Sequence, residues 1–169
     1  MLLLLLTLTS AMKTSIRANM RCKLKELSAE HVNIESNKVY ERLLRIPEYL
    51  NSRGLSVFIS MNGEVQTSNI IDNAFSSGKR VIVPKILGKT SESMFMLEVR
   101  DIEQLESFPK NSWGIAEPPI ELVKQSEDCT YNGSIDLIVV PGVIFDTRCG
   151  RVGHGKGYYG MVSKAICRL

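Results

Sequence analysis

The chain has 169 residues, of which 44% are hydrophobic and 23% charged, and its formal net charge is +3. This length suits one domain with its own hydrophobic core. The basic excess is confined to residues 1–28, which carry five basic residues and one acidic residue. Because the remainder is near neutral and shows no basic face interleaved with aromatic residues, the sequence argues against a nucleic-acid binder.

The cysteines and the N-terminus constrain the cellular compartment. The four cysteines form no C-x-x-C pair, and only two histidines could join them. A zinc site or disulfide framework is therefore not expected, and scattered thiols suit a reducing compartment. The apolar run at the start is far shorter than the ~20 residues of a membrane span and lacks the basic region of a secretory signal.

We therefore expect residues 1–12 to be a leader or disordered segment and residues 13–169 to form a single domain in the cytosol, with no membrane partner. A mitochondrial presequence stays open as an alternative. No acidic residue precedes Glu26, whereas basic and hydroxyl residues do, which is the composition of such presequences.

Two amphipathic helices are predicted before the first strand. From Lys13 onward, apolar residues recur at helical spacing, and Lys13, Arg17 and Arg21 form a cationic stripe beside them. Ser28 is a suitable N-cap for a second helix, which would run through Leu44 and stop before Pro47.

A βαβ unit is predicted next. Residues 54–61 form a β-rich apolar run that ends at an Asn-Gly turn. Thr67 is expected to cap a helix that stops at Gly78, and residues 80–86 then form a second strand.

The next part of the chain is less regular. Residues 93–99 are a third apolar run, whereas residues 113–123 contain too many prolines for a regular element. Residues 135–142 form the strongest predicted strand, because an uninterrupted apolar run suits a sheet that is covered on both faces.

The stretch "GRVGHGKGYYG", residues 150–160, contains five glycines and one lysine. As a P-loop it lacks the hydroxyl residue for magnesium, since glycine stands at position 157. As a dinucleotide fingerprint it lacks the acidic residue expected ~20 positions later. Glycines nevertheless allow backbone N–H groups to form a concave anion site, to which Lys156 and a helix starting at Tyr158 or Tyr159 would add positive charge. The alternative is a surface turn with a solvated lysine.

Residues 141–159, "PGVIFDTRCGRVGHGKGYY", resemble the signature of the 5-formyltetrahydrofolate cyclo-ligase family, also called methenyltetrahydrofolate synthetase. Lys13, Arg17, "FISMNGEVQT" at 58–67 and "SWGIAEP" at 112–118 support this resemblance. It implies an α/β fold with three α/β/α layers and a mostly parallel sheet, similar to the NagB/RpiA/CoA-transferase-like fold. It also implies a monomer that acts on small molecules.

The reaction implied by the resemblance is an ATP-driven ring closure. 5-Formyltetrahydrofolate and MgATP would give 5,10-methenyltetrahydrofolate, ADP and phosphate, and positioning and electrostatics would replace a protein nucleophile. The family's ATP-binding positions correspond to Lys13, Arg17, Arg151, Val152, Gly153, His154, Gly155, Lys156, Gly157, Tyr158 and Tyr159. Its substrate-binding positions correspond to Ile59, Glu64, His154, Gly155, Lys156, Gly157 and Tyr158, with Trp113 either stacking on the substrate or packing in the core.

The sequence also departs from the family pattern. Gly160 stands where the family has an aspartate that binds magnesium, which leaves no metal ligand here except Asp146 as a substitute. His154 occupies a position that is often arginine. The family continues for several further elements beyond the position of Leu169, so the sheet is expected to be incomplete. Two hypotheses follow: a working ligase, or a truncated chain that binds nucleotide or folate weakly or does not fold stably.

Overall fold

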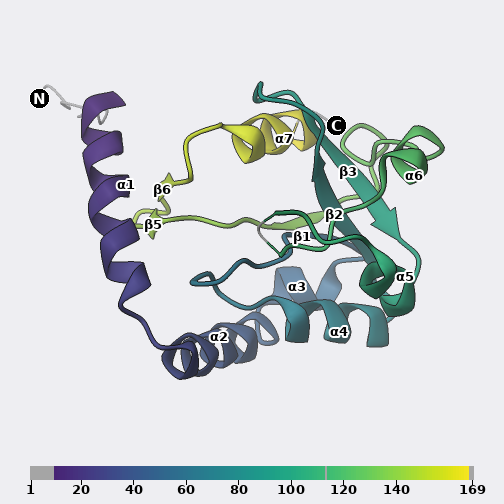
Figure 1. Ribbon diagram of the computed structural model, residues 1–169. Helices are drawn as coiled ribbons and strands as arrows, with labels where there is room; N and C mark the ends of the chain where they lie inside the picture. The colour runs from purple at the N-terminus through teal and green to yellow at the C-terminus, as the bar shows by residue number, and fades with distance from the viewer. Residues whose placement is uncertain (1–9, 113, 168–169) are drawn as a thin grey trace, which may run out of the picture.

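The computed structural model describes residues 10–112 and 114–167, which form a mixed α/β domain (Figure 1). Its helices are α1 (Ser10–Lys25), α2 (Ala29–Leu43), α3 (Pro47–Asn51), α4 (Ser68–Ser76), α5 (Ile102–Ser107), α6 (Ile120–Lys124) and α7 (Tyr158–Ile166). Its strands are β1 (Gly54–Val57), β2 (Arg80–Ile86), β3 (Met94–Val99), β4 (Leu137–Val139), β5 (Ile144–Phe145) and β6 (Arg151–Val152).

The central sheet is mostly parallel, as the sequence predicts. Its four strands lie in the order β3-β2-β1-β4, and β1 runs parallel to both β2 and β4. Only β3 is antiparallel, paired with β2 along its whole length. Strands β1 and β2 with helix α4 between them form the predicted βαβ unit.

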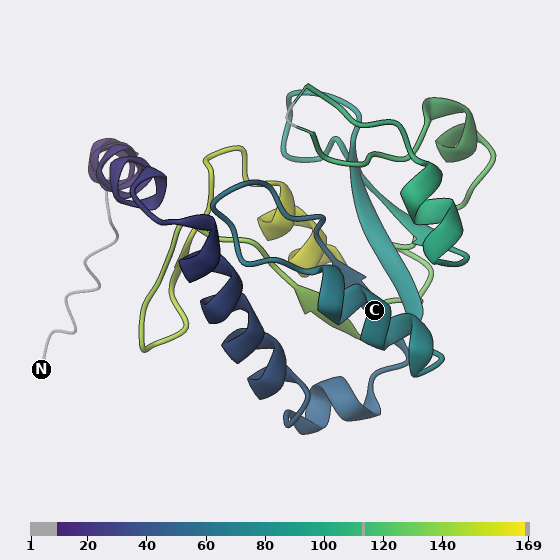
Figure 2. The same cartoon turned by 60° about the horizontal axis from the view of Figure 1, so that its bottom comes forward.

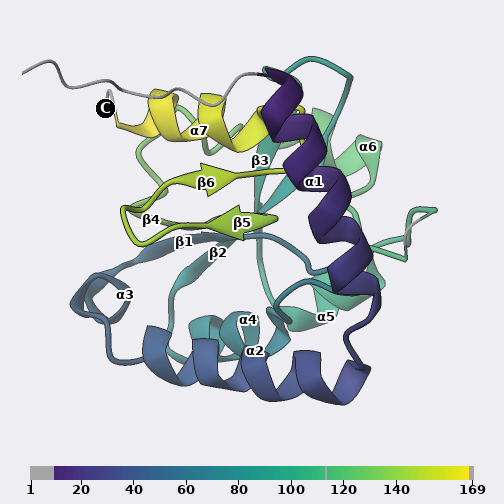
Figure 3. The ribbon, with the colours of Figure 1, turned by 90° about the vertical axis from the view of Figure 1, so that its left-hand side faces the viewer.

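Helices cover both faces of this sheet. On one face, Leu55, Val57 and Val81 pack with residues of α3, α4 and α5 in a buried cluster. On the other face, Ile82 and the methionines of β3 pack against Tyr159 and Val162 of α7. Figures 1 and 3 show α7 on one side of the sheet and α4 on the opposite side. The three layers therefore follow from the alternation of side chains along the strands.

Capping explains the ends of two helices. The Ser28 side chain accepts a hydrogen bond from the His31 N–H at 3.1 Å, which confirms it as the N-cap of α2. Thr67 occupies the N-cap position of α4, but its hydroxyl donates to the Phe58 carbonyl at 2.7 Å instead. This bond ties the start of α4 to the chain that leaves β1. Helix α2 ends at Leu43, before Pro47, as predicted. Pro47 is also the first residue of the short helix α3, a position where the missing N–H of proline costs no hydrogen bond.

Three strand and loop predictions need correction. The first strand ends at Val57, four residues before the predicted end at Met61. The predicted strand 135–142 is reduced to the three residues of β4. These residues are half-buried because β4 is an edge strand: among the described strands, β1 is its one neighbour. Residues 113–123 are not irregular throughout, since α6 begins directly after two prolines. The helix α5 and the β5–β6 hairpin were not predicted at all.

Helix α1 lies apart from the sheet, beside the β5–β6 hairpin (Figures 1 and 3), whereas α2 lies along α4 (Figure 2). In the described ranges, no helix combines the length and the apolar character needed to cross a membrane. The expected leader falls mainly on residues 1–9, outside the described residues, and α1 already begins at Ser10. The division at residue 13 stays a prediction.

Candidate functional site

The sheet opens at the carboxyl ends of its parallel strands. Pairing between β1 and β2 ends with Ser56 opposite Ile82, although β2 continues to Ile86 along β3. Pro84 lies in this extension, and a proline has no N–H to offer a neighbouring strand. The chain after Val57 therefore leaves β2, and the resulting gap lies where ligands of open α/β sheets collect.

A cavity of about 600 Å³ occupies this position. One wall is apolar and consists of side chains from β2, β3 and the loops beside them. The opposite wall is the glycine loop between β6 and α7, together with cations from α1 and β6. The lining residues are Arg17, Phe58, Ile59, Met61, Glu64, Pro84, Ile86, Met94, Ile115, Ala116, Glu117, Pro141, Arg151, Gly153, His154, Gly155, Lys156, Gly157, Tyr158 and Tyr159.

The glycine loop presents backbone donors to this cavity. Gly155 and Gly157 adopt φ values of 121° and 80°, which side-chain-bearing residues rarely reach. In the described part of the chain, the amides of residues 154–157 donate to no other backbone group. Gly157 is also the N-cap of α7, so the positive end of that helix adds to the loop. Together with the exposed Lys156, this wall is suited to an anion.

Two arginines border the loop and donate to carbonyl oxygens. Arg17 Nε of α1 donates to the Gly153 carbonyl at 2.8 Å, which joins α1 to the loop. Arg151 Nε donates to the Pro141 carbonyl at 2.8 Å, and its guanidinium lies 5.7 Å from the Tyr159 ring centre. Desolvation lowers the pKa of Arg151 below its ordinary value. Arg151 is exposed and has no carboxylate partner among the described residues, so its guanidinium can bind an anion.

Glu64 and His154 meet across the cavity mouth. His154 Nε2 lies 3.2 Å from Glu64 Oε1, and the other oxygen of Glu64 accepts the Met61 N–H at 3.0 Å. The contact is an ion pair when the imidazole is protonated. It joins the loop after β1 to the glycine loop, 90 positions later in the sequence.

The two tyrosines after the glycine loop have different surroundings. The Tyr158 hydroxyl donates to the Gly88 carbonyl at 2.8 Å, so it holds the β2–β3 turn against the start of α7. Tyr159 is buried against the sheet, and burial raises the pKa of its hydroxyl well above the ordinary value. Tyr159 therefore stays neutral and anchors α7.

Most residues predicted for the site line this cavity, but three described ones do not. Lys13 is exposed on α1 and does not reach the lining. Val152 lies in β6, where its carbonyl accepts the Val143 N–H at 2.8 Å. Asp146 lies in the β5–β6 turn and binds the amides of Arg148 and Gly150. Trp113 lies outside the described residues.

Sequence reasoning missed the apolar wall and one carboxylate. Glu117 lines the cavity, with Lys85 Nζ at 2.7 Å and Asn111 Nδ2 at 2.8 Å. Pro84 gave the available signal, because a proline inside a strand indicates an unpaired stretch of its edge. The remaining wall residues looked like ordinary core residues in the sequence.

The described side chains do not fit a magnesium ion held by the protein. In the ranges 10–112 and 114–167, no three acidic, histidine or cysteine side chains are grouped as metal ligands. Gly160 offers no side-chain oxygen, and Asp146 lies outside the cavity lining. Mg²⁺ prefers several oxygen ligands, so phosphates and water would have to supply them.

The sequence is similar to known proteins over almost its whole length. The model of the 5-formyltetrahydrofolate cyclo-ligase family matches residues 9–168. The chain belongs to this family.

Several relatives named as 5-formyltetrahydrofolate cyclo-ligases share over a third of the aligned residues with this chain. The probable 5-formyltetrahydrofolate cyclo-ligase of Schizosaccharomyces pombe is 38% identical, with 89% of this chain and 71% of the relative covered. The corresponding Caenorhabditis elegans protein is 37% identical, with 87% and 70% covered. The NMR structure of Aquifex aeolicus 5,10-methenyltetrahydrofolate synthetase superposes with a TM-score of 0.70 at 28% identity, covering 91% of this chain and 73% of that one.

Proposed function

We propose that this cyclo-ligase family member catalyses the ATP-dependent conversion of 5-formyltetrahydrofolate to 5,10-methenyltetrahydrofolate, with release of ADP and phosphate. The observation that carries the proposal is the cavity itself, because a donor-rich glycine loop faces an apolar wall across the open end of the sheet. A phosphoryl donor and a flat pterin ring need these two surfaces side by side. We also propose that the domain has the NagB/RpiA/CoA-transferase-like fold and acts as a monomer.

The glycine loop is proposed to hold the ATP phosphates. The amides of residues 154–157, Lys156 and Arg151 would neutralise the γ-phosphoryl group, with Arg17 reaching it from α1. Lys13 and Val152 would contact the nucleotide only after local movement, since neither lines the cavity. The phosphoryl group moves from the ADP oxygen to the formyl oxygen: one P–O bond breaks and one forms.

Ring closure then needs only positioning. N10 attacks the formyl carbon, the carbon–oxygen bond breaks, phosphate leaves with the formyl oxygen, and N10 loses its proton. The apolar wall and Ile59 would hold the pterin close to the loop, and Glu64 would accept hydrogen bonds from its N–H groups. His154 restrains Glu64 for this role, and a stacking role for Trp113 stays a proposal.

Mg²⁺ is proposed to arrive as MgATP, with the phosphates as its ligands, and no protein ligand is assigned to it. A cytosolic location is proposed from the four free cysteines, three of which are exposed.

The first test measures product absorbance and ADP release with 5-formyltetrahydrofolate, ATP and the purified chain. Lys156→Ala should reduce ATP affinity about tenfold to a hundredfold, the worth of a charge-assisted hydrogen bond. Lys164→Ala is the matched control, since this exposed lysine of α7 does not line the cavity. Thermal melting would check that both variants fold.

Three other outcomes would contradict parts of the proposed function. Unchanged ATP affinity in folded Lys156→Ala would reject the loop as a phosphate site. ATP hydrolysis at the same rate without folate would point to a nucleotide hydrolase. Binding of ATP or folate without turnover would support the second hypothesis, a weakly binding, inactive chain.

A further inference from the structure

A second cavity of about 690 Å³ lies beside the first, between α1 and the loop after β1. Its α1 side carries two cations, Arg21 and Lys25, and its loop side carries the polar residues Ser60, Asn62 and Gln66. Arg21 and Lys25 are four residues apart in one helix, so their side chains lie on the same face. Neither makes an ion pair with any residue in the described ranges.

The two cavities share a border. Met61, Glu64 and His154 line both of them. The Glu64 carboxylate is held by the Met61 amide and by His154, so its charge is partly offset. An elongated ligand can therefore cross from the first cavity into the second beside this pair.

The size of the first cavity requires such a crossing. A volume of about 600 Å³ suits one ligand of ordinary size. The proposed reaction brings a nucleotide and a pterin together, so part of one ligand must lie outside. The pterin substrate has its reacting atoms in and next to the ring and its two carboxylates at the far end. Those two carboxylates match the two cations of the second cavity, Arg21 and Lys25. The nucleotide is the less suitable occupant, because its phosphates are proposed to bind the glycine loop of the first cavity.

We propose that the second cavity binds the glutamate end of the folate substrate, with its two carboxylates on Arg21 and Lys25. The inference rests on the proposed function and assigns α1 a role in recognising the substrate as well as the nucleotide. Partly exposed charge pairs are individually weak, but two of them at a fixed spacing select for a tail with two carboxylates.

The test compares 5-formyltetrahydrofolate with 5-formyltetrahydropteroate, which lacks the glutamate. The double variant Arg21→Gln/Lys25→Gln should raise the KM of the first substrate about tenfold. Its kcat, its KM for ATP and its KM for the shortened substrate should not change. Lys23→Gln is the matched control, because this exposed lysine of α1 lines neither cavity. Added salt should reduce the difference between wild type and double variant.

Three results would overturn the proposal: an equal rise in KM for both folates, a rise in the KM for ATP, or no change in any KM. If the wild-type chain shows no turnover, that result counts against the proposed function and not against the subsite. The second cavity is then tested by measuring ligand binding directly. Calorimetry with N-(4-aminobenzoyl)-glutamate should show binding to wild type and to Lys23→Gln but not to the double variant. Equal binding to all three proteins, or to none, would reject the subsite.

Discussion

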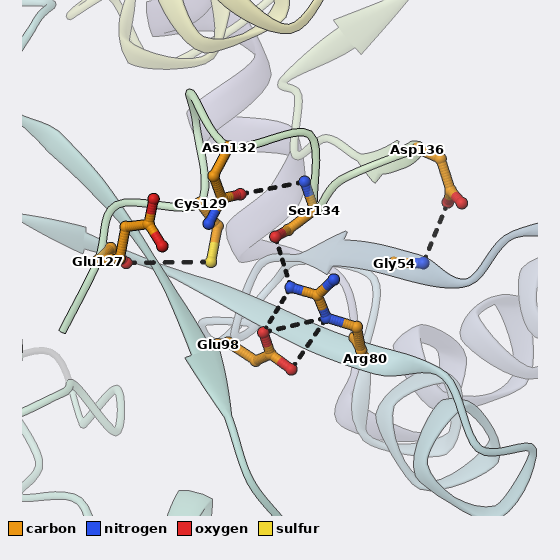
Figure 4. Close-up of polar contacts among 8 residues, drawn as sticks. All are labelled: Gly54, Arg80, Glu98, Glu127, Cys129, Asn132, Ser134 and Asp136. Atoms are coloured by element: carbon orange, nitrogen blue, oxygen red, sulfur yellow. Dashed lines mark hydrogen bonds and ion pairs between the residues drawn. The ribbon is translucent and has the colours of Figure 1, made fainter.

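The two ends of the parallel strands differ in how their charges are partnered. At the amino end, Figure 4 shows Arg80 between Glu98 and Ser134. Arg80 Nη2 lies 2.7 Å from Glu98 Oε2, and another of its contacts is with the Ser134 hydroxyl. Asp136 accepts the amides of Arg53 and Gly54 at 2.9 and 3.2 Å, which joins the starts of β1 and β4. Polar groups at this end satisfy one another.

At the carboxyl end the cations exceed their partners. Arg17 and Arg151 donate to carbonyl oxygens, and Lys156 makes no ion pair with any residue of the described ranges. The backbone amides of the glycine loop are similarly available. The same sheet thus has one end whose charged groups are paired and another end with several cations that have no acidic partner among the described residues. Substitutions at the first end should affect stability, and substitutions at the second should affect ligand affinity.

The largest effect is expected from Gly54→Ala at the paired end. A Cβ atom at this position would lie 1.7 Å from the Ser134 carbonyl oxygen, so β1 and the chain before β4 would have to separate. We expect the free energy of unfolding to fall by about 4 kcal/mol or more, measured by urea denaturation. Gly160→Ala is the control, because its Cβ would meet nothing within 4 Å. A stable Gly54→Ala protein would contradict the close packing at this end.

Arg151→Met tests the opposite end and should leave stability nearly unchanged. Its side chain is exposed and has no carboxylate partner in the described ranges, so the fold gains little from its charge. ATP affinity should fall about tenfold to a hundredfold, measured by nucleotide titration.

The matched substitution Arg80→Met at the paired end should affect stability and not ATP affinity. It should lower stability by at most about 1 kcal/mol, because the Arg80 and Glu98 side chains are 46% and 41% exposed and water screens them. ATP affinity should stay the same. If both variants behave alike, the contrast between the two ends is wrong.

Gly160→Asp should supply a side-chain ligand for magnesium and should also raise stability modestly. Position 160 lies in the first turn of α7 with open space around it. Replacing a helical glycine and placing a carboxylate near a helix N-terminus should together contribute about 0.5–1 kcal/mol.

The Mg²⁺ concentration for half-maximal cyclo-ligase activity should also fall in Gly160→Asp, since magnesium gains a protein oxygen. A magnesium titration of both proteins would measure this change. High activity of the unmodified chain at low Mg²⁺, without any gain from the substitution, would place the metal ligands elsewhere, and Asp146 would be the first residue to test.

The smallest effect is expected in the β5–β6 turn and depends on pH. The amides of Gly150 and Arg148 donate to the Asp146 carboxylate and lower its pKa below the ordinary value of 3.8. A carboxyl group with a lowered pKa stabilises the fold above its unfolded-state pKa, and this contribution disappears as the pH falls through the folded-state value. Asp146→Asn should therefore be slightly less stable than wild type at pH 7 and equally stable near ~pH 2. A stability difference that does not depend on pH, measured by denaturation at both values, would contradict this assignment.

Local sequence signals predicted much of the fold. Helical spacing and the Ser28 cap located α1 and α2, and the βαβ unit followed from two apolar runs with a helix between them. Short elements were missed, because α5 and α6 each have only five or six residues and their sequences carry too little periodicity. The extent of β4 was overestimated, since an apolar run does not reveal how many neighbouring strands pair with it.

The sequence by itself determined the glycine loop, its family and the identity of its charged residues. These features are local, because glycine spacing and a following helix are properties of a short stretch of chain. Only the tertiary structure decided which distant groups meet there. The early end of β1 opened the cavity, the β2–β3 hairpin supplied its apolar wall, and Glu64 reached His154 across 90 positions. Such contacts depend on strand register and packing, which no local pattern encodes.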